Sequence, residues 1–389
     1  MTTPDSALYQ LIVLGKPGAN ILADLEAEIR RAIQNFQLDF GTQVTWTVAA
    51  GPIDIPPDQA AAAIYFGHLG ADDAEVESMV SQSVPILPVV DDLEHATGQL
   101  PPSIQPLNAL GLKQNPLERI ASALLECVSL LPRQRRVFLS YRRIESRSAA
   151  LQLFDTLSAR QFNVFLDTHE ISPGVHFQQA LWHNLCDCDV LVMLDTADYF
   201  GSRWTKAEFG RALAKGIPIL RVGWPSVATA RIAQTSSSIA LDGIDLDAGG
   251  NISLTKVTEI CNAVERLRCL SHAVRNLNIV SHLKKAAECV GGQLKAVGRN
   301  SAVHIELPSG GGEIIVYPQV GVPTSRSLQE AHGYAISRTT LVPAVVYDHL
   351  GLDPAWQGHL DWLGDQVQAV RWLKLERAAW SFADWEDKT

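Results

Sequence analysis

The chain has 389 residues, of which 47% are hydrophobic, and its 32 Lys and Arg against 42 Asp and Glu give a formal net charge of −10. This length and hydrophobic content predict two or three globular domains and argue against long disordered segments. The acidic balance argues against nucleic acid or a membrane surface as a general partner, because both are polyanionic.

The cysteines and the hydropathy pattern indicate the cellular compartment in which the protein is expected. None of the six cysteines forms a CxxC pair or a spacing typical of a zinc site. Cys186 and Cys188 fall in a predicted helix-to-strand connection, where buried thiols are favoured over a metal clip. The sequence has no signal peptide and no apolar run of about 18 residues, the length that a transmembrane helix needs. We therefore expect a soluble, cytoplasmic protein with reduced cysteines and no membrane partner.

Residues 1–131 predict a first α/β domain. Four apolar runs are typical of strands: Leu11–Gly15, Val44–Val48, Ala61–Gly67 and Val84–Val90. Helical periodicity covers 20–36 and 115–131, and the Pro-rich stretch 91–115 predicts a long surface connection. Lys16–Asn20 matches neither phosphate-loop pattern, because it lacks both the Gly-Lys-Ser/Thr ending and a third glycine. We interpret this domain as regulatory or assembly-forming, without catalysis of its own.

An arginine cluster follows the predicted boundary near residue 131. It consists of Arg133, Arg135, Arg136, Arg142, Arg143 and Arg147. Such a cluster either serves an anionic ligand or keeps an interdomain linker solvated, and the sequence leaves both readings open.

Residues 132–270 predict a second α/β domain. Its strand-like runs are Val137–Ser140, Val164–Leu166, Val190–Leu194, Ile217–Val222 and Ile239–Leu241. Helical periodicity lies between them at 146–160, 175–185 and 203–214, and an amphipathic helix over 252–270 closes the domain. This alternation predicts βαβ units on a parallel sheet. Because the carboxyl ends of parallel strands share one edge, Ser140–Arg143, Asp167–Gly174 and Asp195–Trp204 should converge on one cleft.

The first domain repeats the order of elements of the second. Each has a strand that carries the sequence Pro-Ile-Leu, and aligning these strands without gaps sets Glu75 opposite Glu208 and Ala71 opposite Trp204. An internal duplication that lost its site and a coincidence among α/β folds both remain open.

Four motifs in the second domain resemble one known family, the Toll/interleukin-1 receptor (TIR) domains. The motifs are Phe138–Arg143, Val164–Asp167, Asp167–Gly174 and Trp204–Glu208, and the resemblance covers about 135–245. It is closest to the enzymatic branch that cleaves NAD⁺, which includes bacterial defence proteins. The resemblance implies a flavodoxin-like fold with a parallel sheet.

The pair Trp204 and Glu208 carries the chemistry that can be argued from residues. Four positions apart, they lie one turn apart on one face of a helix that Ser202 is placed to cap. A carboxylate beside an aromatic wall suits a flat cationic ring joined to a sugar, because a fixed anion stabilises positive charge on the sugar carbon. Ordinary glycosidases need a second carboxyl group to protonate the departing oxygen. Nicotinamide leaves a pyridinium as a neutral molecule, so one carboxylate can be enough.

The resemblance assigns roles to further residues. It implies that Glu208 is catalytic and that the substrate meets Trp204, Phe138, Ser140, Tyr141, Arg142, Arg143 and Ser172. Arg142 and Arg143 can neutralise a pyrophosphate through forked donors, and solvated loop charges are the alternative. Ser172 departs from the family, because the TIR enzyme of animals that acts in axon degeneration carries an acidic residue at the matching position. This departure puts ribose contacts from the loop in doubt. Neither a metal nor a cofactor is expected, since NAD⁺ would be the substrate.

Residues 271–389 predict a small α+β domain that resembles no family known to us. Helices are predicted at 271–290, 324–337 and 354–366, and strands at Gln293–Val297, Val303–Leu307 and Ile314–Tyr317. Histidines and tryptophans gather at 342–362, which suits a nucleotide pocket, a protein interface or a plain core. We expect this domain to receive an unknown activating ligand or protein.

These observations predict an NAD⁺ glycohydrolase that releases nicotinamide and leaves ADP-ribose or a cyclic form of it. The resemblance further implies that the enzyme is activated by self-association through TIR domains and acts in bacterial antiphage defence. Two alternatives stay open. One is a non-enzymatic TIR scaffold that recruits other TIR domains, and the other is a nucleosidase or base-exchange enzyme that acts on NADP or related dinucleotides.

Overall fold

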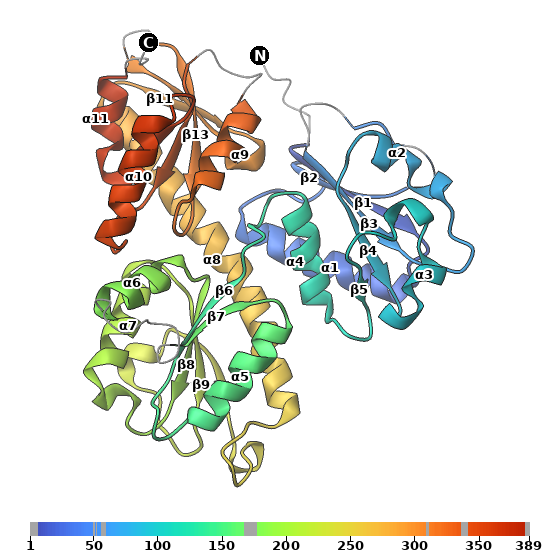
Figure 1. The fold of residues 1–389 in the computed structure, drawn as a ribbon, viewed down its shortest axis with the longest axis vertical. Coiled ribbons are helices and arrows are strands. Elements are labelled where there is room, and N and C mark those ends of the chain that lie inside the picture. The colour runs from blue at the N-terminus through green and yellow to red at the C-terminus, as the bar shows by residue number, and fades with distance from the viewer. Residues whose placement is uncertain are drawn as a thin grey trace. The chain divides into compact units, whose positions relative to one another are not determined.

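The chain divides into two compact units, Met1–Arg133 and Gln134–Thr389 (Figure 1). A computed structural model describes residues 7–49, 51, 53–55, 60–166, 177–308, 311–335 and 341–385. In these parts of the chain no helix is both long enough and apolar enough to cross a membrane.

The first unit is built on a five-stranded parallel sheet in the order β2-β1-β3-β4-β5. Its strands are β1 (Tyr9–Gly15), β2 (Val44–Val48), β3 (Ala60–Phe66), β4 (Ile86–Val90) and β5 (Leu110–Gly111). Its longer helices, α1 (Ala19–Asn35) and α4 (Leu117–Cys127), pack on each other, and the short helices are α2 (Glu77–Ser81) and α3 (Ala96–Gln99). The four predicted strands are confirmed. Strand β5 was not predicted, and it lies within the stretch predicted as a surface connection. A strand of two residues is too short to show a periodicity.

The second unit begins with a sheet of the same kind, in the order β10-β9-β8-β6-β7 and parallel throughout. Its strands are β6 (Arg136–Ser140), β7 (Asn163–Leu166), β8 (Val190–Asp195), β9 (Ile219–Gly223) and β10 (Ser237–Ala240). Counted from the first strand of each sheet, both sheets have the order 2-1-3-4-5, which is flavodoxin-like. The predicted parallel sheet and the repeated order of elements are therefore confirmed.

Helices cover both faces of this second sheet. Side chains of α5 (Arg147–Ala159) and the first half of α8 (Leu254–Cys289) pack on one face, and those of α6 (Phe177–Asp187) and α7 (Arg203–Ala214) on the other. Successive strand residues alternate between these two cores, as a pleated strand requires. The three helices predicted between the strands, at 146–160, 175–185 and 203–214, each lie within a few residues of an observed helix.

The helix α8 is one continuous element of 36 residues, whereas two helices were predicted at 252–270 and 271–290. That division was wrong, because the sequence between Leu254 and Cys289 contains neither Gly nor Pro to end a helix. The first half buries Val257 and Ile260 on the parallel sheet, and the second half buries Ile279 and Leu283 on the last sheet. The predicted domain boundary at residue 270 thus falls inside a helix that both sheets share.

The last sheet has the order β11-β12-β13-β14-β15, antiparallel over its first two pairings and parallel over the last two. Its strands are β11 (Gln293–Val297), β12 (Val303–Glu306), β13 (Glu313–Gln319), β14 (Ala344–Tyr347) and β15 (Arg371–Lys374). The second half of α8 and α11 (Ala378–Ala383) pack on one face, and α9 (Ser325–Ala335) and α10 (Pro354–Gln366) lie across the other (Figure 1). The sequence predicted the antiparallel part and missed β14 and β15, which have four residues each.

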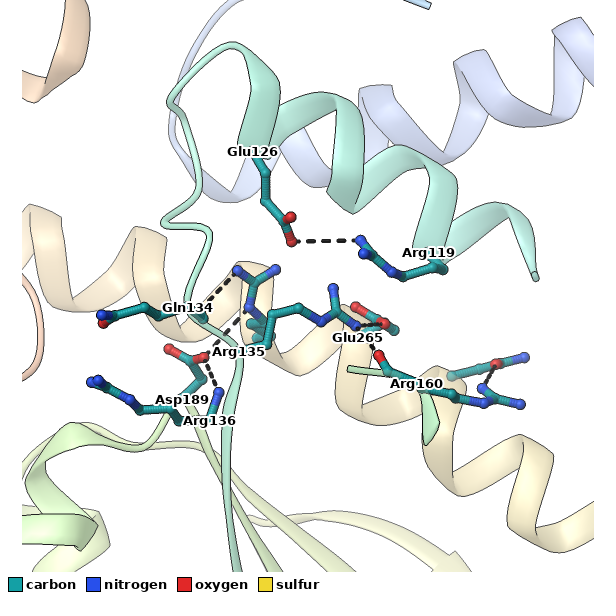
Figure 2. A network of polar contacts seen from close by, with 10 residues as sticks. Arg119, Glu126, Gln134, Arg135, Arg136, Arg160, Asp189 and Glu265 are labelled. Carbon is teal, nitrogen blue, oxygen red and sulfur yellow. Dashed lines mark hydrogen bonds and ion pairs between the residues drawn. The ribbon is translucent and has the colours of Figure 1, made fainter. Parts of the chain in front are cut away.

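Buried ion pairs fasten α8 to the residues that precede β6 and β8 (Figure 2). Arg135 pairs with Glu265, and both side chains are almost fully buried. Arg268 has no exposed surface, and its guanidinium approaches Asp189 at 3.4 Å and donates to the Gln134 carbonyl at 3.1 Å. Arg135 therefore belongs to the interior of the fold, which neither reading of the arginine cluster anticipated.

Removing Glu265, the partner of Arg135, should strongly destabilise the second unit. Glu265→Ala leaves Arg135 buried without its carboxylate, which typically costs about 3 to 5 kcal/mol of unfolding free energy. Glu259→Ala is the matched control, because Glu259 lies on the same helix and is exposed beside Lys256. It should change the unfolding free energy by less than about 0.5 kcal/mol. Equal urea midpoints for the two variants would contradict this account of the network.

Candidate functional site

The candidate site lies where β6 and β8 end side by side. These neighbouring strands are in register, with Ser140 opposite Met193. The chain runs from β6 through α5 to β7, which lies on one side of β6 in the sheet. The following strands, β8 and β9, lie on the other side of β6, so the strand order reverses between β6 and β8. Such a reversal leaves a crevice at the carboxyl ends of the strands, where open α/β sheets bind their ligands.

The helix α7 brings Glu208 to this point. Ser202 caps the helix as predicted, since its hydroxyl accepts a hydrogen bond from the Trp204 amide at 3.2 Å. Glu208 lies in the second turn with 2% of its surface exposed. The Ser140 hydroxyl, at the end of β6, donates to the Glu208 carboxylate over 2.5 Å. Two residues far apart in the sequence, both predicted for the site, are therefore in direct contact.

Tyr199 extends this contact into a chain of hydroxyl groups. Its Oη lies 2.6 Å from Ser140 Oγ. A serine hydroxyl has one proton, which goes to the carboxylate, so Tyr199 donates to Ser140 and Ser140 to Glu208. Burial and the neighbouring charge of Glu208 raise the pKa of Tyr199 well above its usual value, so the phenol keeps its proton.

Trp204 stands at the surface end of the same helix. It is 38% exposed, and the Arg203 guanidinium lies 4.5 Å from the centre of its ring. The helix therefore presents a partly exposed indole one turn before a buried carboxylate. An aromatic ring in this position can meet a flat ligand, and the Arg203 cation already occupies the space over one of its faces.

Arg142, in the loop after β6, ties this loop to the loop after β8. Arg142 donates to the carboxylate and to the backbone carbonyl of Asp198, each at 3.1 Å, and Glu145 is 3.9 Å away. Thr196 hydrogen-bonds to Glu145. Arg143 lies exposed beside this contact. Two of the three segments predicted to converge are thus adjacent, while the third, Asp167–Gly174 with Ser172, lies outside the described residues.

Phe138 and Tyr141 are core residues in this conformation. Phe138 has no exposed surface and packs on Phe165 with ring centroids 5.0 Å apart. Tyr141 is 6% exposed and belongs to the core on the opposite face of the sheet. The strand alternates its side chains between two buried faces, so a motif at its end contains packing residues as well as site residues. Both rings therefore contribute to the packing of the domain.

Sequence reasoning missed two contributors to the site. Tyr199 falls inside the predicted cleft segment Asp195–Trp204, and only that position hinted at its role. Asp195 and Arg221 form an ion pair at 2.5 Å with both side chains buried, and Arg221 also donates to Ser238 and to the Val227 carbonyl. This pair fixes the end of β8 to β9 and thereby holds the segment that carries Tyr199.

A family comparison identifies this region. Residues 137–249 match the profile of the TIR domain. The chain contains a TIR domain. The match covers β6 to β10 together with α7, and therefore includes Ser140, Tyr199, Trp204 and Glu208.

Other comparisons add little. No curated protein sequence matches the chain. Among solved structures, two crystal forms of proximal thread matrix protein 1 from the mussel byssus align with 68% of this chain. The first covers 96% of that protein at 13% identity and the second 97% at 10%, each with a TM-score of 0.22. Scores this low establish no shared fold.

The bond from Ser140 should matter for stability as well as for the position of Glu208. Ser140→Ala removes the hydroxyl that donates to the buried carboxylate, which should lower the unfolding free energy by about 1 to 3 kcal/mol. Ser148→Ala makes the same change at an exposed position of α5 and should stay within about 0.5 kcal/mol of wild type. Chemical denaturation measures both, and a Ser140→Ala midpoint equal to that of the control would argue against the contact.

Proposed function

We propose that the TIR domain is an NAD⁺ hydrolase with Glu208 as its catalytic residue. The observation that supports the proposal is the buried carboxylate of Glu208 at the meeting point of β6 and β8, one helical turn from the partly exposed Trp204. The leaving group needs no activation by a metal or an acid, since the nicotinamide ring already carries a positive charge.

In the proposed reaction the bond between nicotinamide N1 and ribose C1′ breaks heterolytically. The electron pair goes to the ring nitrogen, so the pyridinium leaves as neutral nicotinamide, and positive charge develops on the ribose. The Glu208 carboxylate stabilises that charge in a site with little water, where a fixed anion is most effective. Water then adds to C1′ and loses a proton, giving ADP-ribose. Attack by an adenine nitrogen instead would give a cyclic product.

The substrate contacts follow from the same placement. Trp204 would stack against the nicotinamide riboside, and the exposed Arg143 would meet the pyrophosphate. Arg142 is held by Asp198, so it would contribute to the pyrophosphate only by exchanging that partner. Tyr199 and Ser140 would hold the carboxylate in one orientation throughout the reaction.

The burial of Glu208 makes activation part of the proposal. With 2% of its surface exposed, the carboxylate cannot reach a ribose until the site opens. A TIR domain implies association with other TIR domains, and we infer that this self-association opens the site. An activating ligand or protein at the C-terminal domain would then control assembly. The proposed setting is bacterial antiphage defence, in which the loss of cellular NAD⁺ stops phage growth.

The second candidate is a non-enzymatic TIR scaffold. The same burial favours it, because a carboxylate that accepts from Ser140 inside the fold also serves a purely structural role. In that case association with other TIR domains would be the whole function, and substitution of Glu208 by its amide would leave signalling intact.

NAD⁺ turnover decides between these candidates. Purified protein is incubated with NAD⁺ in dilute buffer and with a crowding polymer, while light scattering reports assembly and chromatography resolves nicotinamide, ADP-ribose and cyclic products. The assembled wild type should release nicotinamide, and Glu208→Gln should lower kcat by about 100-fold or more, the typical cost of losing one preorganised electrostatic group. Glu259→Gln removes a carboxylate from the exposed face of α8 and should retain full activity.

Three results would contradict the proposal. Equal turnover by wild type and Glu208→Gln would remove Glu208 from the reaction. Assembly without any turnover of NAD⁺ would favour the scaffold, and turnover of NADP alone would shift the substrate to the phosphorylated dinucleotide.

A further inference from the structure

The sheet of the first unit repeats the arrangement that carries the TIR site. In β1 and β3, Leu14 stands opposite Tyr65, just as Ser140 stands opposite Met193 in β6 and β8. The two Pro-Ile-Leu strands fix this correspondence, since Leu87 pairs with Ile64 and Leu220 with Val192. Leu14 therefore replaces the serine that holds Glu208, and Tyr65 brings a hydroxyl from the neighbouring strand instead.

A carboxylate is held at the matching edge of this sheet as well. Glu75 accepts a hydrogen bond from the buried Tyr65 hydroxyl at 3.1 Å and lies 2.9 Å from His68 Nε2. Burial by itself would raise the pKa of Glu75, but the hydrogen bonds from His68 and Tyr65 lower it overall. Glu75 is therefore ionised at neutral pH, and with 31% of its side chain exposed it is far more accessible than Glu208.

A cavity of about 510 Å³ opens beside this carboxylate. It begins at the carboxyl end of β1, where Gly15 has φ +76°, and a Cβ on that residue would lie 2.0 Å from the Phe66 carbonyl oxygen. Leu14 and Met79 supply apolar wall, and Glu75 and Glu77 supply negative charge. Neither lysine nor arginine is among the described residues that line the cavity.

We propose that this cavity is a second ligand site, and that it binds a small organic cation with a flat apolar body and no phosphate, the chemistry of a pyridinium nucleoside. The ionised Glu75 attracts the cationic ring, and the apolar wall accepts its faces. A phosphate would meet the carboxylates of Glu75 and Glu77, with neither lysine nor arginine among the described lining residues to offset them, which costs binding energy. The volume accommodates one nucleoside, within the range of small-molecule sites in proteins.

The two sites are expected to bind different ligands. A dinucleotide needs basic partners for its pyrophosphate. The TIR domain offers Arg142 and Arg143, whereas the described residues that line the first cavity include neither arginine nor lysine. The first unit would therefore sense a nucleoside rather than cleave a dinucleotide. This inference does not rest on hydrolysis by the TIR domain, because it concerns binding alone.

Calorimetric titration of the full chain with nicotinamide riboside tests the proposal. All proteins carry Glu208→Gln, so that the TIR domain consumes no ligand. The riboside should bind, and Glu75→Gln should weaken binding about tenfold, because the amide keeps the acceptor oxygen for Tyr65 and His68 but loses the charge. Glu94→Gln is the control, because it removes the same charge from an exposed position of the same unit. It should bind the riboside with the affinity of the parent protein.

Two related ligands sharpen the result. Nicotinamide mononucleotide adds only a phosphate and should bind at least about tenfold more weakly, and the reduced, uncharged riboside should also lose affinity. Thermal melting of each variant checks that it is folded. The proposal is overturned if the riboside does not bind at millimolar concentration, if Glu75→Gln binds it unchanged, or if the mononucleotide binds equally well.

Discussion

The hydrogen bond from Ser140 to Glu208 is the contact on which the TIR site depends. It joins the end of β6 to the second turn of α7, and Tyr199 completes it from the segment between β8 and α7. A carboxylate buried at the end of a parallel sheet needs such donors, since burial without them would be costly. The same contact holds the Glu208 carboxylate in one position at the carboxyl ends of β6 and β8.

The two parallel sheets of the chain solve one architectural problem with different residues. Each holds a glutamate near the carboxyl ends of its first and third strands, through Ser140 and Tyr199 in one case and through Tyr65 and His68 in the other. The surroundings differ in charge, because Arg142 and Arg143 follow Ser140 in the loop after β6, whereas a second carboxylate, Glu77, lines the cavity beside Glu75. Identical topology therefore leaves room for different ligands, and the side chains at the sheet edge decide between them.

Local periodicity predicted most of this fold, and long-range burial explains the rest. The parallel strands, the cap at Ser202 and the pairing of Trp204 with Glu208 on one helix could all be derived from spacing. The continuity of α8 could not, because its two halves bury different faces on different sheets. The bond to Ser140 and the pair between Arg135 and Glu265 join residues 68 and 130 positions apart, which no local pattern reveals. Phe138 belongs to the same motif as Ser140 but lies in the buried core. The motif alone does not distinguish these two roles.

The most direct test of the central claim is a structure of the assembled protein bound to a carbocyclic NAD⁺ analogue, whose bond to nicotinamide cannot be cleaved in the same way. We predict that Glu208 becomes accessible in the assembly and that its carboxylate lies within about 3.5 Å of the ring carbon that replaces C1′. Trp204 should then lie against the nicotinamide. An analogue bound in the crevice while Glu208 stays buried beneath Ser140, or an analogue bound elsewhere, would contradict the account.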